Sequence, residues 1–156
     1  MVLSLYVRVI SSASLIIGDA STFKSTQTYN VGSDIPSQQN GIVYANPNTI
    51  VSVSLSGVLN VFDTRESSSS KWRTLHGPTK AITSSTLAES TFYAGSFDGT
   101  MKSFSVSSGE DEGKCSAVGG TGHSGQVSGL VSDVQGKVWS AGWDDKVASI
   151  EGDGFS

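Results

Sequence analysis

The stretch Ile50–Asp63 reads IVSVSLSGVLNVFD and joins two apolar, largely β-branched runs through a short turn. The same arrangement returns in Phe92–Ser105 (FYAGSFDGTMKSFS) and Val138–Glu151 (VWSAGWDDKVASIE). Aligned on their turns, successive copies are separated by 42 and 46 residues. A period of about 40 to 45 residues with several strands in each repeat is typical of β-propeller blades. The sequence therefore predicts an all-β chain built from such blades.

Each copy is expected to turn on one pair of residues: Ser56-Gly57, Asp98-Gly99 or Asp144-Asp145. We predict a two-residue primed turn at these positions, because its central residues need positive φ and Gly and Asp tolerate that conformation. The Asp98-Gly99 pair gives the strongest signal. Asp144-Asp145 gives the weakest, because it has no glycine at the second position.

Alternation along residues 49–55 predicts a half-buried strand, with Thr49, Val51, Val53 and Leu55 on one face. Asn46-Pro47-Asn48 is expected to turn the chain before this strand. The polar stretches 66–70 (ESSSS) and 107–114 (SSGEDEGK) are interpreted as exposed loops. No stretch has the 3.6-residue apolar period of a long helix.

The spacing predicts about three WD-repeat blades plus a partial one, and thus an incomplete propeller. The expected divisions are residues 1–20 as an atypical N-terminal segment, 21–38 as the outer strand of a preceding blade with a linker, 39–79 and 80–121 as blades, and 122–156 as an incomplete blade. A propeller ring usually needs four to eight blades, so we interpret the chain as a piece of something larger. An open arc leaves strand edges and sheet faces in water, so marginal stability or association is expected for the isolated chain.

Composition narrows the classes of partner. The net charge of −4 and the pI near 5.0 argue against nucleic-acid binding, which needs clustered Lys and Arg. The apolar opening Met1–Ile17 lacks the basic start of a signal peptide, and no run is long enough to span a bilayer. A single cysteine, Cys115, favours a reducing compartment. We therefore expect a cytoplasmic protein without nucleic-acid or membrane partners.

Residues 120–125 (GTGHSG) match the dinucleotide-binding pattern G-x-G-x-x-G, and Asp145 follows at a suitable distance. The residues after Gly125 alternate as a strand does, so the helix that this motif requires is not expected. His76 and His123 suggest a Ser-His-Asp hydrolase, but no G-x-S-x-G elbow occurs. Two histidines and one distant cysteine do not support a zinc site. We predict no catalytic residue, metal or cofactor, and hence a protein that is not an enzyme.

A structural interpretation suits His123 better. In WD-type repeats a Gly-His pair precedes the first strand of a blade, and the histidine reaches the aspartate of the later tight turn. Gly122-His123 lies 21 residues before Asp144 and is followed by a strand that opens at Val127. We therefore predict a buried polar brace between His123 and Asp144. In the preceding copy Pro78 replaces the histidine, so this brace is not expected there.

Other blade features are divergent. The Trp-Asp pair that ends a WD-type blade is replaced at each position, by Gly18-Asp19, Phe62-Asp63, Phe104-Ser105 and Ile150-Glu151. Three tryptophans, Trp72, Trp139 and Trp143, are interpreted as packing residues and not as a ligand platform.

Several strings resemble one WD-repeat family, the actin-interacting protein 1 family, especially its fungal members. They are STFKSTQTYNVG (21–32), QQNG (38–41), Ile50–Asp63, AGSFDGTMKSF (94–104), GHSGQVSGLV (122–131) and WDDKV (143–147). The resemblance covers about Ser21 to Ser156, and it implies the stretch where the first of two seven-bladed propellers ends and the second begins. It also implies binding to actin filaments and cooperation with cofilin/ADF in filament disassembly at the actin cytoskeleton. The alternative is a generic WD-repeat scaffold for another complex, and neither interpretation assigns contact residues.

Overall fold

The computed structural model describes residues 5–10, 14–30, 38–66, 73–76, 80–105, 115–117, 122–151 and 154–155. Every regular element within these ranges is a strand. The strands are β1 (Leu5–Ile10), β2 (Ser14–Asp19), β3 (Ser25–Asn30), β4 (Gln39–Asn46), β5 (Thr49–Ser54), β6 (Val58–Asp63), β7 (Arg73–His76), β8 (Ile82–Ala88), β9 (Thr91–Ser96), β10 (Met101–Ser105), β11 (Cys115–Ala117), β12 (Val127–Ser132), β13 (Val138–Gly142), β14 (Val147–Glu151) and β15 (Gly154–Phe155).

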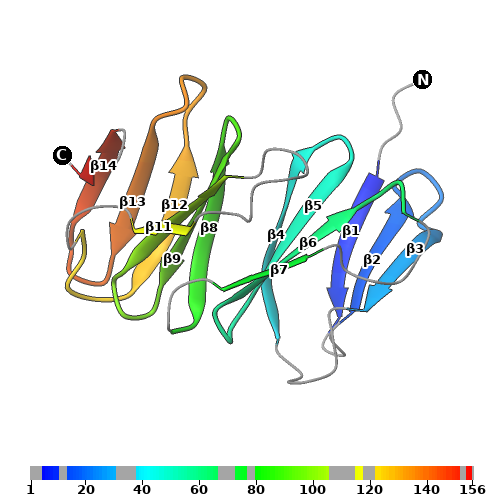
Figure 1. Cartoon of the computed structure of the whole chain (residues 1–156), viewed down its shortest axis with the longest axis horizontal. Coiled ribbons are helices and arrows are strands. Elements are labelled where there is room, and N and C mark those ends of the chain that lie inside the picture. Colours follow the sequence, from blue (N-terminus) through cyan, green and yellow to red (C-terminus); the bar gives the residue numbers. More distant parts are fainter. Residues whose placement is uncertain are drawn as a thin grey trace.

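These strands form four antiparallel sheets, in each of which the strands follow one another in chain order. The first sheet has three strands, β1 to β3, and residues 1–20 supply two of them. The others have four strands each: β4 to β7, β8 to β11 and β12 to β15. The four sheets stand face to face in a row, from blue to red in Figure 1. The predicted fold class, all-β with blades in an unclosed arc, is confirmed for the described residues.

First strands of neighbouring blades lie against one another, since β8 contacts both β4 and β12. Side chains tie these strands together. Asn40 Nδ2 donates to the carbonyl of Ile82 at 3.1 Å, and Thr83 Oγ1 donates to the carbonyl of Val127 at 2.6 Å. Each bond joins residues 42 or 44 apart, so the sequence period reappears as a structural repeat.

Apolar residues fill the three spaces between the four sheets. Between β1–β3 and β4–β7, the rings of Tyr29 and Phe62 lie 5.2 Å apart at a tilt of 51°. Between β4–β7 and β8–β11, Phe92 and Phe104 join the aliphatic residues of β5 and β6. Burying one such side chain contributes about 1.5–3 kcal/mol, so the stack of sheets is held mainly by these contacts.

The interpretation of residues 49–55 as a half-buried strand is wrong. All six residues of β5 are buried, serines included. The reason is that β5 lies in a sheet packed on both faces: Ile50 joins the cluster toward β1–β3, and Val51 joins the cluster toward β8–β11. Ser52 is accommodated because its hydroxyl donates to Gln39 Oε1 at 2.9 Å.

The turns also differ from the predicted primed type. Only the second residue of each pair has positive φ: 79° at Gly57, 82° at Gly99 and 59° at Asp145. The Gly99 N–H donates to the carbonyl of Ser96 at 3.2 Å, and Gly57 does the same to Ser54 at 3.1 Å. Three residues separate the strands at the first turn and four at the other two, where the prediction was two. Loops of three to five residues are commonly built on a type I turn, and here each has one left-handed residue.

Three further expectations from the sequence lie partly or wholly outside the described residues. Of the loop at 66–70 only Glu66 is described, and the loop at 107–114 is not described at all. Pro78, the replacement for histidine, is likewise outside them.

Strand β12 follows Gly125 where a nucleotide-binding domain would have a helix, as the alternation predicts. Within the described ranges, no helix has the length and apolar character needed to cross a membrane.

Candidate functional site

His123 is the centre of a buried polar cluster in the last blade. Its side chain is completely enclosed, with Nδ1 2.8 Å from Asp144 Oδ1 and Nε2 2.9 Å from the Ser140 hydroxyl. A carboxylate only accepts hydrogen bonds, so Nδ1 donates to Asp144, and Nε2 is hydrogen-bonded to the Ser140 hydroxyl. The second oxygen of Asp144 accepts the backbone N–H of Ser124 at 3.0 Å.

Backbone geometry makes room for this cluster. A Cβ added at Gly142 would overlap His123 Nδ1 and come within 2.7 Å of Asp144 Oδ1. Only glycine therefore leaves space for the imidazole at this end of β13. Because the three side chains come from the segment before β12, from β13 and from the turn before β14, the cluster joins successive parts of one blade.

The Asp144 carboxyl is shifted toward its ionised form. The N–H of Ser124 and the side chain of His123 lower its pKa from 3.8 to about 2. A carboxyl with a lower pKa in the folded than in the unfolded chain stabilises the fold fully above its unfolded value. That stabilisation is lost as the pH falls from about 4 toward 2. Asp63 has a similarly lowered pKa because Arg65 donates to it.

We therefore expect the free energy of unfolding of the chain to fall as the pH is lowered from about 4 to 2. The Asp144→Asn variant should show a smaller fall over the same range. Urea midpoints measured by circular dichroism at steps from pH 4 to pH 2 check this. Asp145→Asn is the matched control, since its exposed carboxyl lies one residue further along the same turn. Equal acid sensitivity in Asp144→Asn and the unaltered chain would contradict the assignment. Some sensitivity remains in either case because of Asp63.

The other predicted turn residues lie in their own blades, and Gly99 lies against the backbone carbonyls of His123 and Gly125 in the next blade. In the second turn, Asp98 Oδ1 accepts from the N–H and the hydroxyl of Thr100 at 3.1 and 2.5 Å. In the first turn, the hydroxyls of Ser54 and Ser56 lie 2.8 Å apart. Gly57 and Gly99 supply the left-handed positions that follow. Each group fixes a local turn and offers no reactive centre.

One set of residues was missed by the sequence interpretation. Immediately before each turn pair stands a large apolar residue, Leu55, Phe97 or Trp143, with 39%, 58% and 71% of its surface exposed. Their common place in the repeat, one residue before Ser56, Asp98 and Asp144, was the available signal. We call these three residues the apolar rim. The expectation that Trp139 and Trp143 are packing residues is wrong. Trp143 lies in the turn beyond the end of β13, and Trp139 of β13 is 40% exposed.

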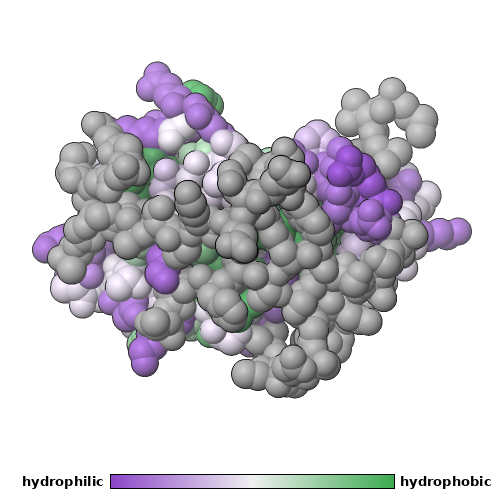
Figure 2. Space-filling model, in the orientation of Figure 1, coloured by the Kyte–Doolittle hydropathy of each residue, from purple (hydrophilic) through white to green (hydrophobic). Residues whose placement is uncertain are grey.

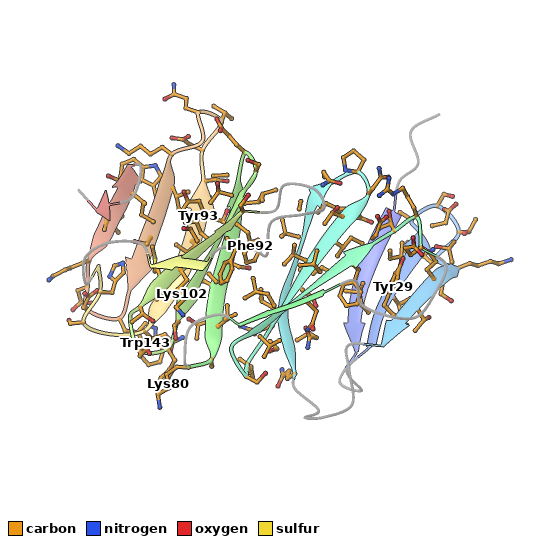
Figure 3. The ribbon with its side chains drawn as sticks, viewed as in Figure 1. Tyr29, Lys80, Phe92, Tyr93, Lys102 and Trp143 are labelled. Atoms are coloured by element: carbon orange, nitrogen blue, oxygen red, sulfur yellow. The ribbon has the colours of Figure 1, made fainter. Side chains whose placement is uncertain are left out.

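The same backbone hydrogen bond recurs at each residue of the apolar rim. The N–H groups of Leu55, Phe97 and Trp143 donate to the carbonyls of Gln38, Ala81 and Gln126, at 2.9, 3.0 and 2.9 Å. Each acceptor immediately precedes the first strand of its blade. Because all three blades stack with parallel first strands, the rim lies along one edge of the molecule. Trp143 and the exposed Lys80 both lie at the lower edge in Figure 3.

The other exposed apolar residues include Val131, Trp139 and Val147 of the last sheet, and Phe23 and Val134, which lie outside the strands. Figure 2 shows that the described residues on this side are mainly hydrophilic or neutral, with hydrophobic ones in small areas. The described residues hold no group of three His, Cys, Asp or Glu able to bind a metal ion. Trp72 and the side chain of His76 lie outside the described part. The described arrangement can position side chains on a rim. Ser140, His123 and Asp144 are connected in the order of a hydroxyl nucleophile, a base and an orienting acid, but Ser140 and His123 are only 1% and 3% exposed, so the hydroxyl is closed to a substrate.

Stacked antiparallel four-stranded sheets, repeating every 42 to 46 residues, are blades of the WD-repeat β-propeller class. No family model matches the sequence. The chain is similar to WD repeat-containing protein 1-B of Xenopus laevis, with 31% identity over 133 residues, which is 83% of this chain and 21% of that protein. It is also similar to actin-interacting protein 1 of Drosophila melanogaster, with 30% identity over 132 residues, covering 81% and 20%.

The chain thus spans about a fifth of the length of these relatives. Among solved structures, the computationally designed Ika4 protein superposes with a TM-score of 0.74 at 19% identity, covering 95% of this chain and 86% of that one. This likeness concerns the fold alone.

Proposed function

We propose that the chain is a non-catalytic WD-repeat module that binds protein partners through the apolar rim. The observation that carries this proposal is the equivalence of Leu55, Phe97 and Trp143, which are exposed at one position of three successive blades. Exposed tryptophan and phenylalanine are frequent anchors in protein interfaces, because they bury a large area at little cost in conformational entropy. The backbone N–H group of each residue is already hydrogen-bonded, to Gln38, Ala81 or Gln126, so less backbone freedom is lost on binding.

The partner proposed is the actin filament, together with cofilin/ADF, in the cytoplasm. Support comes from similarity to a relative named actin-interacting protein 1, which extends over 81% of this chain. Lys80, exposed beside the carbonyl that holds Phe97, adds a cation to the rim and suits a partner with acidic groups. In this proposal the blades bind the filament and cofilin, and cofilin disassembles the filament.

Co-sedimentation of the full chain with actin filaments, with and without cofilin, tests the proposal. We expect binding that increases when cofilin is present and falls about tenfold in the double variant Phe97→Ser, Trp143→Ser. The control is Val134→Ser, which alters a fully exposed apolar residue on a turn at the opposite edge of the blade. Filament binding unaffected by the double variant would refute the rim, and no binding under either condition would refute the partner.

A further inference from the structure

The turn that carries Phe97 rests on the backbone of the next blade. Gly99, two residues after Phe97, is buried although it lies in the turn between β9 and β10. A Cβ added at Gly99 would lie 2.3 Å from the carbonyl oxygen of His123 and 2.9 Å from that of Gly125. Both oxygens belong to the backbone, which cannot rotate away as the end of a long side chain can. The turn is therefore in direct contact with residues 123–125, and a side chain at Gly99 has no space.

The same segment, residues 123–125, lies against Trp143. A Cβ added at Gly125 would be 3.4 Å from both the carbonyl carbon and the Cβ of Trp143. The Trp143 N–H donates to the carbonyl of the residue just before β12, and the His123 ring and the Ser124 N–H both bond to Asp144. The segment is thus hydrogen-bonded to the turn that carries Trp143.

Phe97 and Trp143 are therefore joined by a continuous path of packed backbone. The path runs from Phe97 through Gly99 to residues 123–125, and from there to Trp143. The side chains at its two ends are exposed, whereas Gly99 and His123 within it are buried. Closely packed backbone has little room to shift, so the two exposed rings are held at one spacing.

The left-handed turn does not by itself require glycine. Asp145 has the position of Gly99 in the last blade, with the left-handed φ of 59° and an exposed side chain. The turn thus accepts a residue other than glycine where its side chain has space. At Gly99 the carbonyl of His123 excludes any side chain, so glycine is needed there for the contact between blades.

We propose that Gly99 is a positioning residue, which seats the turn of one blade on the next and makes Phe97 and Trp143 a single anchor of fixed spacing. This inference rests on the proposed function, in which the apolar rim binds the partner. Such an anchor fits a partner with two neighbouring apolar pockets, because neither ring has to be brought into place on binding.

The spacing of residues 97 and 143 tests the positioning without any partner. Nitroxide labels are attached to Phe97→Cys and Trp143→Cys in the full chain, after its one cysteine is removed by Cys115→Ser. Electron paramagnetic resonance then gives the distribution of distances between the labels. We expect Gly99→Ala to broaden or shift this distribution, because the added methyl group pushes the turn away from residues 123–125.

Gly136→Ala is the matched control. Gly136 has the same φ of 82° as Gly99, so its replacement introduces the same backbone strain. The added Cβ, however, meets only the flexible side chain of Glu89, with Oε1 3.3 Å away. The distribution should therefore stay as in the unaltered backbone. A distribution that Gly99→Ala leaves unchanged, or that both variants broaden equally, would overturn the proposal.

A comparison with glycine retained decides the matter if circular dichroism shows that Gly99→Ala does not fold. Labels at Ser90→Cys and Phe97→Cys report the spread of distances within one sheet, since these residues flank β9. We expect the pair at 97 and 143 to show a spread as narrow as this reference pair. A clearly wider spread between the two blades would overturn the fixed spacing.

Co-sedimentation with cofilin-decorated actin filaments asks whether the spacing matters for binding. We expect Gly99→Ala to weaken binding by up to the about tenfold loss expected of the Phe97→Ser, Trp143→Ser double variant, and Gly136→Ala to leave it unchanged. Unweakened binding by Gly99→Ala would overturn the single anchor. If the unaltered chain does not bind filaments, the proposed partner is refuted, and the label distances still decide whether Gly99 fixes the two positions.

Discussion

Replacing Phe92 by alanine lowers the free energy of unfolding by about 3–5 kcal/mol. Phe92 is 1% exposed and lies in the cluster that joins β4–β7 to β8–β11, with its ring 6.5 Å from that of Phe104. The substitution removes apolar contacts and leaves a cavity that two packed sheets cannot close. Since whole domains are stable by only about 5–15 kcal/mol, a large part of the stability of the chain depends on this side chain.

The matched control is Phe97→Ala, five residues further along. Phe97 is 58% exposed, and its N–H bond to Ala81 survives truncation of the side chain. We expect it to change stability by less than about 0.5 kcal/mol. Urea unfolding followed by circular dichroism measures both variants. Comparable losses for Phe92→Ala and Phe97→Ala would show that the space between these sheets is not the core of the molecule.

Replacing His123 by alanine is expected to lower the free energy of unfolding by about 2–4 kcal/mol. The substitution removes two hydrogen bonds and leaves their buried polar partners without this ring. The Ser140 hydroxyl, in a residue only 1% exposed, loses the ring nitrogen 2.9 Å away, and Asp144 loses the donor 2.8 Å away. Thermal unfolding, together with hydrogen exchange of the β12 to β14 amides, would report the loss. Exchange should accelerate most in this blade.

Ser124→Ala serves as the control for His123→Ala. The side chain of Ser124 belongs to an exposed residue, whereas its backbone N–H to Asp144 Oδ2 is retained in the variant. It should unfold close to the unaltered chain. A His123→Ala variant that unfolds at the same temperature as Ser124→Ala would show that the polar cluster contributes nothing to the blade.

The repeat made much of this architecture predictable. Strand runs of alternating polarity, joined by turns at a fixed spacing, indicate blades whatever the neighbouring sheets are, because local backbone preference produces both signals. For the same reason, the spacing between Gly122-His123 and Asp144 was enough to pair two residues that lie 2.8 Å apart in the structure. The residues of the apolar rim recur with the same spacing, but their apolar character did not predict that they are exposed.

The class of fold, the period of the blades and the positions of their turns could be predicted from the amino-acid order, since each depends on residues close together in the chain. Which of these residues are buried depends on how the sheets pack against one another. β5 is covered on both faces, and Trp143 points outward. A residue is buried by sheets that lie more than forty residues away in the chain. The local sequence pattern does not show which of these sheets pack together.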